Sequence, residues 1–234
     1  MQLRCSSLRS RASAVAVALL ALPVVAPAAQ AGVPASFRAA GELAASVVVR
    51  ARPSASAPRI GLLTEFRPDF RRRIVLALGA RRELNRVWYR VSLPRRPNGR
   101  TGWVRARSVV VRPTRSEIVV RRGRRTLEVH VGGQLRLHTR VVVGAPGMET
   151  PLGLFYVTDG FRPTNSFLGS YALETSAYSR LSDWPGGGIV GIHGTSQPWL
   201  LGRAVSHGCI RVSNAVALRP KALAPLGTPI RILR

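Results

Sequence analysis

The stretch from residue 191 to residue 214, GIHGTSQPWLLGRAVSHGCIRVSN, brings two histidines and one cysteine together within a short part of the chain. His193 ends an apolar run and precedes Gly194, whose missing side chain lets the backbone bend so that its carbonyl can orient the imidazole. His207 and Gly208 come directly before Cys209. A thiol with the ordinary pKa of about 8.5 is mostly protonated at neutral pH, so a nucleophilic cysteine needs a histidine or another cation nearby to hold the thiolate. The stretch therefore predicts that Cys209 is a nucleophile.

Cysteine usage singles out the same residue. The sequence contains two cysteines, and Cys5 lies in an N-terminal segment that we expect to be removed. Cys209 is then alone in an exported protein, where it has no partner for an internal disulfide and can be reactive. The alternative is a buried cysteine that acts as a small hydrophobic residue. Gly208 favours catalysis, because a glycine permits an unusual backbone conformation that turns amide groups toward a substrate oxygen.

A zinc site is another interpretation of these residues. His193, His207 and Cys209 are all good zinc ligands, but no fourth ligand and no carboxylate base lies near them in the sequence. His130 and His138 fall on predicted strands without a partner at ligand spacing, and we expect both to be structural or exposed. The sequence therefore predicts neither a metal nor any other cofactor.

Residues 1–31 have the three regions of a secretory signal peptide. Three arginines precede an apolar run over residues 12–29, and cleavage is expected after Ala31. A retained membrane anchor is the alternative, but Pro23 and Pro27 leave an uninterrupted apolar stretch that is short for a bilayer. Cys5 precedes the apolar run instead of following it, which argues against lipidation. We expect the protein outside the cytoplasm, in the cell wall or periplasm, with membrane attachment only if the signal peptide is retained.

The charge balance is strongly basic. The sequence has 36 Lys+Arg against 10 Asp+Glu, a formal net charge of +26. Such a charge attracts polyanions, and nucleic acid is one class of them. The chain has no zinc-finger spacing and no phosphate-cradling glycine loop, so we expect no nucleic-acid partner. For an exported protein the available anions include cell-wall polymers and stem-peptide carboxylates, which we expect as partners.

The part of the chain before residue 114 predicts a linker and a small domain. Residues 32–45 are mostly small and lack a pattern, which is typical of a linker. Residues 46–113 contain short β-branched and aromatic runs separated by Pro, Gly, Asn and Ser, which predict a small barrel or sandwich. We expect Trp88 and Trp103 to pack in its core, although both could line a ligand groove.

Residues 114–234 predict a second, mainly β domain. Alternating runs surround the glycine pair at 132–133, which predicts a hairpin, and further strands are expected at 153–157, 188–192 and 227–233. The segment 215–224 is the one short helical stretch that we expect, and Pro220 interrupts it.

Both domains resemble known families. Residues 49–53, 88–91 and 98–104 are similar to a bacterial SH3-like domain. The motifs GIHGT (191–195), LGRAV (201–205), SHGCIRVSN (206–214) and LGTPI (226–230) resemble the YkuD-type L,D-transpeptidases over residues 116–234, with TPLGLF (150–155) where that family has its proline-glycine strand entry. The resemblance implies a mainly β chain, in which a small SH3-like barrel is followed by a β-sandwich-like catalytic domain with one short helix.

The resemblance also implies a reaction. In that family the cysteine attacks the third residue of a peptidoglycan stem peptide, the terminal D-alanine leaves, and the thioester is passed to the amine of another stem. Carried over, Cys209 is the nucleophile, His193 the base and the Gly194 carbonyl its orienter, while His207 and the amides of Gly208 and Cys209 bind the oxyanion. Three more residues would hold the motif together or contact substrate: Ser206, Arg211 and Asn214.

Two departures from the family and two competing functions accompany this interpretation. Residues 215–217 are Ala-Val-Ala where the family often has an acidic residue, and residues 161–187 are hard to align, so we assign them no catalytic role. The same site could pass the thioester to water, as an L,D-carboxypeptidase or endopeptidase does. Alternatively the chain could be a non-catalytic cell-wall-binding protein that uses its SH3-like domain and basic surface.

Overall fold

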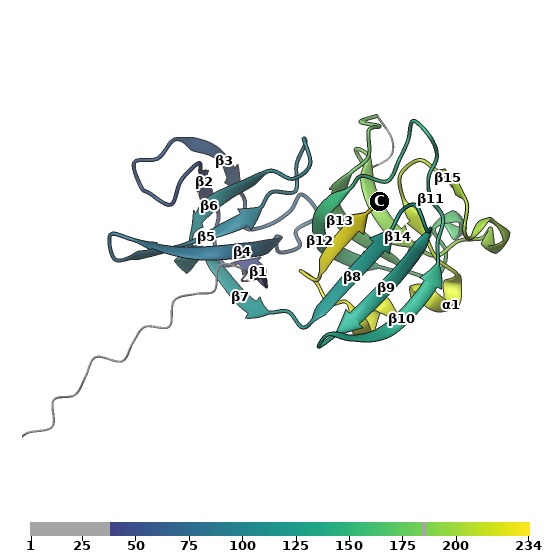
Figure 1. Ribbon diagram of the computed structural model, residues 1–234. Coiled ribbons are helices and arrows are strands. Elements are labelled where there is room, and N and C mark those ends of the chain that lie inside the picture. The colour runs from purple at the N-terminus through teal and green to yellow at the C-terminus, as the bar shows by residue number, and fades with distance from the viewer. Residues whose placement is uncertain (1–37, 184–185) are drawn as a thin grey trace, which may run out of the picture. The chain divides into compact units, whose positions relative to one another are not determined.

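Short β-branched and aromatic runs form most of the strands in the computed structural model, which describes residues 38–183 and 186–234 (Figure 1). These residues belong to one compact unit that contains two large sheets and one two-stranded sheet. The prediction of a mainly β fold is confirmed. The predicted signal peptide, residues 1–31, lies outside the described residues.

The first sheet has seven antiparallel strands in the order β3-β2-β6-β5-β4-β1-β7. Trp88 is buried, and the core on this sheet also contains Val49, Val75 and Val104. That this sheet is an SH3-like domain over residues 46–113 stays a prediction. The strands are β1 (Ala39–Leu43), β2 (Val47–Arg50), β3 (Arg59–Leu63), β4 (Ile74–Glu83), β5 (Arg86–Ser92), β6 (Thr101–Arg105) and β7 (Val109–Pro113), and a 3-10 turn, η1 (Ala106–Ser108), precedes the last of them.

The expectation of a linker over residues 32–45 is wrong for β1, which pairs with both β4 and β7. Small residues are needed in this strand because it is closely packed. A Cβ atom on Gly41 would lie 2.8 Å from Val109 Cγ1 and 2.9 Å from Val75 Cγ2. The composition that is typical of a linker therefore comes from a crowded strand. Residues 32–37 lie outside the described residues.

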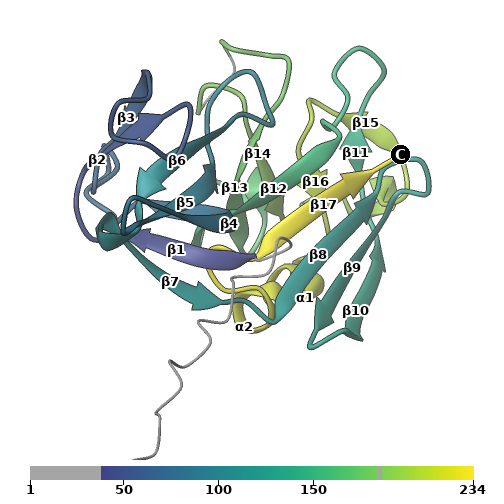
Figure 2. The same ribbon diagram turned by 60° about the vertical axis from the view of Figure 1, so that its left-hand side comes forward.

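The second sheet has eight strands in the order β10-β9-β8-β17-β12-β13-β14-β16. Figure 2 shows β17 between β8 and β12, with β8 parallel to it and β12 antiparallel. The short parallel pair β14–β16 ends the sheet, and β11 pairs with β15 separately. The strands are β8 (Ser116–Arg121), β9 (Thr126–Val131), β10 (Gln134–Arg140), β11 (Val143–Gly144), β12 (Gly153–Phe161), β13 (Ala172–Tyr178), β14 (Ile189–His193), β15 (Ala204–Ser206), β16 (Ile210–Arg211) and β17 (Pro229–Leu233).

The predicted helical segment consists of two single turns, α1 (Asn214–Ala217) and α2 (Pro220–Leu223). The Ser213 hydroxyl caps α1 by accepting a hydrogen bond from the Val216 N–H, and Pro220 separates the turns because it has no N–H to continue the first one. Two 3-10 turns also belong to this half of the chain, η2 (Ser166–Leu168) and η3 (Pro198–Leu200). Within the described ranges, no helix has the length and apolar character needed to cross a bilayer.

The two large sheets share a small apolar core. Ile74 and Leu76 of β4 pack with Tyr156 of β12, whose hydroxyl donates a hydrogen bond to the Ile74 carbonyl at 3.2 Å. Arg67 also donates two hydrogen bonds, of 2.8 and 3.0 Å, to the carboxylate of Glu174 on β13. The first sheet is therefore held directly against the strands that carry the site.

Candidate active site

A cavity of about 400 Å³ contains both residues that the sequence singled out first, Cys209 and His193. It lies against β13 and β14, and much of its wall comes from the segment around η2. The remaining lining residues are Phe161, Asn165, Phe167, Leu168, Ala172, Leu173, Glu174, Gly186, Ile189 and Gly191. Two residues that are 16 positions apart in the sequence thus face one apolar hollow.

Cys209 lies in the turn between β15 and β16. Its sulfur accepts a hydrogen bond from the Gly191 N–H of β14, with a distance of 3.4 Å between N and Sγ. Burial raises the pKa of the Cys209 thiol, while the Gly191 N–H and the charge of Arg211 oppose the shift. The resting sulfur is therefore a thiol at neutral pH, which already has one donor in place for the thiolate.

His193 is the last residue of β14 and pairs with Arg211 of β16. It is only 2% exposed, and its Nδ1 lies 2.6 Å from the Gly194 carbonyl oxygen. The pKa of His193 is lowered to about 4, mainly by burial and also by the charge of Arg211, while hydrogen bonds to the Gly194 and Leu168 backbone oppose the shift. A carbonyl can only accept, so the neutral ring carries its proton on Nδ1 and leaves Nε2 as a base.

The two pKa shifts favour a neutral thiol at Cys209, whereas the sequence led us to expect an ionised sulfur. Burial disfavours charged forms, so it raises the thiol pKa and lowers the imidazole pKa together. In the described part of the chain, Sγ is hydrogen-bonded to Gly191 and not to His193. The resting site is thus a neutral thiol and a neutral imidazole that share a cavity.

Buried hydrogen bonds hold the turn before Cys209. The Ser206 hydroxyl, fully buried, donates to the Cys209 carbonyl at 2.6 Å and accepts from the Gly208 N–H at 3.2 Å. Thr150 Oγ1 donates to the Gly208 carbonyl at 2.8 Å and accepts from the Gly144 N–H at 2.9 Å. Ser206 therefore has the structural role that the sequence left open beside substrate contact. The Gly208 amide, which was expected to bind the oxyanion, is already bonded to the Ser206 hydroxyl.

Asn214 also holds backbone segments together. Its Oδ1 accepts from the Ser170 N–H at 3.0 Å and from the Thr195 N–H at 3.1 Å. A Cβ atom on Gly194 would run into this oxygen, so the glycine after His193 is needed for close packing. Asn214 thus joins the end of β14 to the segment that follows η2, a structural role that the sequence left open beside substrate binding.

Arg211 is a buried cation without a carboxylate partner among the residues that the structure describes. It is 6% exposed, its Nη1 donates to Gln197 Oε1 at 3.2 Å, and its guanidinium lies 4.6 Å from the centre of the Phe167 ring. Its Nε is buried and unpaired, and burial lowers its pKa. Because Phe167 also faces His193, at 6.5 Å between ring centres, the arginine lies next to the cavity.

One predicted site residue, His207, does not line the cavity. It is half-buried and lies in the Cys209 turn.

The structure also adds residues that sequence reasoning missed. Phe167, Glu174 and Gly186 line the cavity, although all three come from the segment 161–187 that received no role. The length of the segment 161–187 between two predicted strands was the feature of the sequence that could have indicated a role in the site. Within residues 38–183 and 186–234, no three His, Cys, Asp or Glu side chains are grouped so as to hold a metal ion.

The fold and the site define a mainly β protein with a half-buried cysteine and a buried histidine in one cavity. Over residues 115–232 the chain matches the YkuD family, described as the L,D-transpeptidase catalytic domain, and it belongs to that family. The resemblance on which the sequence motifs were interpreted is thereby confirmed for this half of the chain. The match does not extend to the first sheet.

Two curated relatives and one solved structure are similar to parts of the chain. The chain is 32% identical to the YkuD protein of Bacillus subtilis (strain 168) over 117 residues, which are 50% of this chain and 65% of the relative. It is 32% identical over 108 residues to YkuD of Bacillus licheniformis, covering 46% and 59% of the two chains. The chain thus spans less than two thirds of these relatives. A solved structure, an L,D-transpeptidase from Mycobacterium smegmatis, has 17% identity and a TM-score of 0.44, covering 64% and 91%.

Proposed function

We propose that the protein is a secreted peptidoglycan L,D-transpeptidase that forms crosslinks between third stem-peptide residues through a thioester on Cys209. The observation that carries this proposal is the cavity shared by Cys209 and His193 in a chain of the L,D-transpeptidase family. The proposal includes export by the signal peptide of residues 1–31 and a location in the cell wall or periplasm. Its substrates are peptidoglycan stem peptides.

The first half of the reaction transfers a peptide to sulfur. Nε2 of His193 takes the proton of the Cys209 thiol, and the Gly191 N–H stabilises the thiolate that forms. Sulfur attacks the carbonyl carbon of the third stem residue, and the bond to the terminal D-alanine breaks. The imidazolium gives its proton to the leaving amine, and the third residue is held as a thioester. The Gly194 carbonyl keeps the ring oriented throughout.

The second half regenerates the thiol. The side-chain amine of another stem attacks the thioester carbon, His193 takes a proton from that amine, and the carbon–sulfur bond breaks. The sulfur then recovers the proton, which leaves an amide between two third residues. The family leads us to expect three oxyanion donors: His207 and the amides of Gly208 and Cys209. Because the Gly208 amide is already bonded to Ser206, this proposal keeps only the Cys209 amide and His207.

The basic surface supports anionic wall polymers as an additional partner. The sequence holds only ten acidic residues, and eight of them already lie within 4.0 Å of a cationic side chain. Most arginines therefore have no carboxylate to neutralise them, and their field attracts polyanions.

Mass spectrometry of the purified protein with a disaccharide tetrapeptide tests the proposal. We expect a thioester adduct on Cys209 and a crosslinked dimer among the products. The adduct should be absent in Cys209→Ala, which has no sulfur to acylate. It should form at least about a hundredfold more slowly in His193→Asn, because a general base accelerates such a step by about that factor. Release of free tripeptide without a dimer would instead identify a hydrolase, and wall binding that is unchanged in Cys209→Ala without any adduct in the wild type would identify a binding protein.

A further inference from the structure

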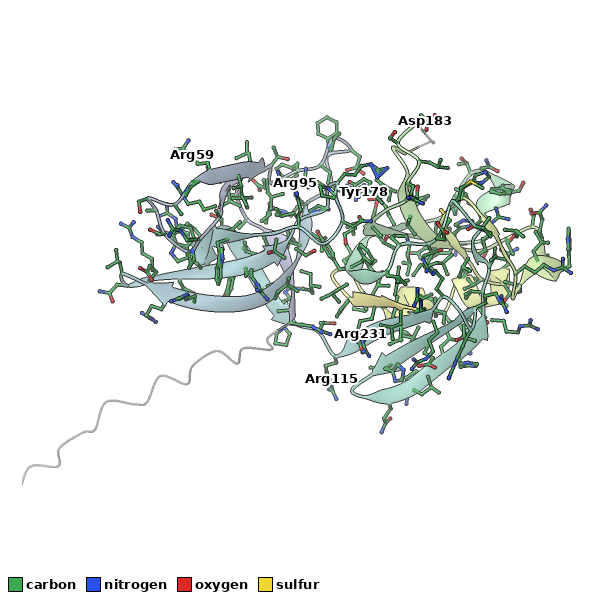
Figure 3. All side chains as sticks on the ribbon, turned by 45° about the horizontal axis from the view of Figure 1, so that its top comes forward. Arg59, Arg95, Arg115, Tyr178, Asp183 and Arg231 are labelled. Carbon is green, nitrogen blue, oxygen red and sulfur yellow. The ribbon has the colours of Figure 1, made fainter. Side chains whose placement is uncertain are left out.

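The loop between β5 and β6, residues 93–100, reaches out of the first sheet and contacts one wall of the cavity. The wall consists of residues 178–183 and 186–188, which lie between β13 and β14 in the sequence. Gly186 of this segment and Ile189 directly after it line the cavity. Figure 3 labels Tyr178 at the start of the segment and Arg95 in the loop. A change in the position of this segment would thus change the shape of the cavity.

Asn98 binds the start of the wall as a neighbouring strand would. Its Nδ2 donates to the Tyr178 carbonyl at 2.7 Å, and its Oδ1 accepts from the Tyr178 N–H at 3.0 Å. The pairing of β12 with β13 ends at Thr175, so the backbone at Tyr178 has no residue of β12 opposite it and needs another partner. The Tyr178 hydroxyl adds a third bond by donating to the Pro94 carbonyl at 3.0 Å.

Arg96 binds both ends of the same wall. Its Nη1 donates to the Ser179 carbonyl at 2.8 Å, and its Nη2 donates to the carbonyls of Leu181 and Gly187, each at 2.9 Å. Its guanidinium also lies 4.8 Å from the centre of the Tyr178 ring. One planar side chain thus ties the outgoing and the returning arms of the segment together, which a single point charge could not do in the same geometry.

The wall in turn supports the turn that carries the nucleophile. A Cβ atom on Gly208 would lie 2.9 Å from Ser179 Cβ, so the two residues are packed closely. The Gly191 N–H that bonds the Cys209 sulfur follows the wall by three residues. The contacts of the loop are therefore passed through the wall to the cavity, while the Gly191 N–H itself belongs to β14.

We propose that Arg96 and Asn98 are positioning residues, with which the first sheet holds residues 178–183 and 186–188 in the shape that the cavity needs to accept a peptide. The inference deepens the proposed function, because the peptide it concerns is the stem-peptide donor. Neither residue touches the reacting atoms. Their effect is on the wall, and the chemistry of the thiol itself does not depend on them.

Hydrogen exchange followed by mass spectrometry tests the positioning directly. We compare the full chain with Arg96→Ala and Asn98→Ala, and with Arg59→Ala as a control that removes an exposed arginine of the same sheet. Amides of residues 179–183 and 186–189 should exchange at least about tenfold faster in the first two variants and at the wild-type rate in the control, since local opening governs exchange. Unchanged exchange in this segment, or an increase spread evenly over the chain, would overturn the proposal.

Two rates at Cys209 separate positioning from chemistry. Acylation by a disaccharide tetrapeptide should slow by about tenfold or more in Arg96→Ala, because a displaced wall misplaces the peptide. Alkylation by iodoacetamide, which is too small to need the wall, should change less than about twofold on the same reasoning. Arg96→Lys should recover part of the acylation rate. Equal losses in the acylation rate and the alkylation rate would contradict the inference. A wild type that is never acylated would refute the proposed function. In that case the hydrogen-exchange experiment still decides whether the loop positions the wall.

Discussion

Gly208 shows how much one backbone conformation matters beside the nucleophile. Its φ of +115° is one that L-residues rarely adopt, and a side chain there would overlap Ser179. We expect Gly208→Ala to lower the free energy of unfolding by roughly 2–4 kcal/mol, through backbone strain of about 1–3 kcal/mol plus the overlap. We also expect it to abolish acylation of Cys209. Urea unfolding and the adduct assay measure the two effects.

Gly133 provides the matched control for that substitution. Its φ is +81°, but a Cβ atom there would meet nothing within 4 Å. Gly133→Ala should therefore lose only the backbone contribution, about 1 kcal/mol, and keep its activity. Equal losses of stability in the two variants would show that the packing against Ser179 is unimportant.

His193 should make stability depend on pH. Its pKa is about 4 in the folded protein, against an ordinary value of about 6.5, so the unfolded chain binds a proton first as the pH falls. Its contribution is complete above pH 6.5 and is lost between about pH 6.5 and 4, to a total of about 3 kcal/mol. In His193→Asn this loss should be missing, whereas the exposed His138→Asn should behave like the wild type. Parallel stability curves of wild type and His193→Asn would contradict the assignment.

At the scale of elements, Asn214 joins β14 to the segment after η2, and its role can be separated from substrate binding. Asn214→Ala leaves the Ser170 and Thr195 amides without their acceptor and should cost about 1–2 kcal/mol of stability. Asn214→Asp keeps an acceptor oxygen, so stability and acylation should both stay close to wild type. A rise in KM for Asn214→Asp with unchanged stability would instead mean that this side chain meets a carboxylate of the substrate.

The sequence allowed the reactive pair and most strands to be predicted, because these depend on neighbouring residues. His193 and Cys209 belong to motifs of a few residues, and β-branched runs mark strands such as β5 and β9. The cavity wall could not be predicted, because Phe167 and Gly186 reach it only through the long-range pairing of β13 with β14. For the same reason, the sequence could not predict the hydrogen bond from the Thr150 hydroxyl to the Gly208 carbonyl, because the two residues are 58 positions apart.

At the scale of the whole molecule, the net charge should control binding to walls. It is +26 for the full sequence and +23 without the three arginines of residues 1–31. We expect binding to sacculi that keep their anionic polymers to weaken steeply when salt is raised from about 0.05 to 0.5 M, because the Debye length falls from about 14 Å to about 4 Å. Sacculi stripped of those polymers should bind less at low salt. Co-sedimentation measures both effects. Binding that is insensitive to salt would point to a contact that does not depend on charge.

The shared core predicts that the two sheets unfold together. Tyr156 is fully buried between them and bonds the Ile74 carbonyl, so loss of either sheet exposes apolar surface of the other. Calorimetry should show one transition with equal calorimetric and van't Hoff enthalpies.

Tyr156→Ala, which removes about 3–5 kcal/mol from this core, should separate the transition into two. Val91→Ala, in the core of the first sheet alone, should lower the midpoint without splitting it. Two transitions in the unaltered chain would mean that the first sheet is tethered to the second and does not support it, and the loop of Arg96 could then not hold the cavity wall.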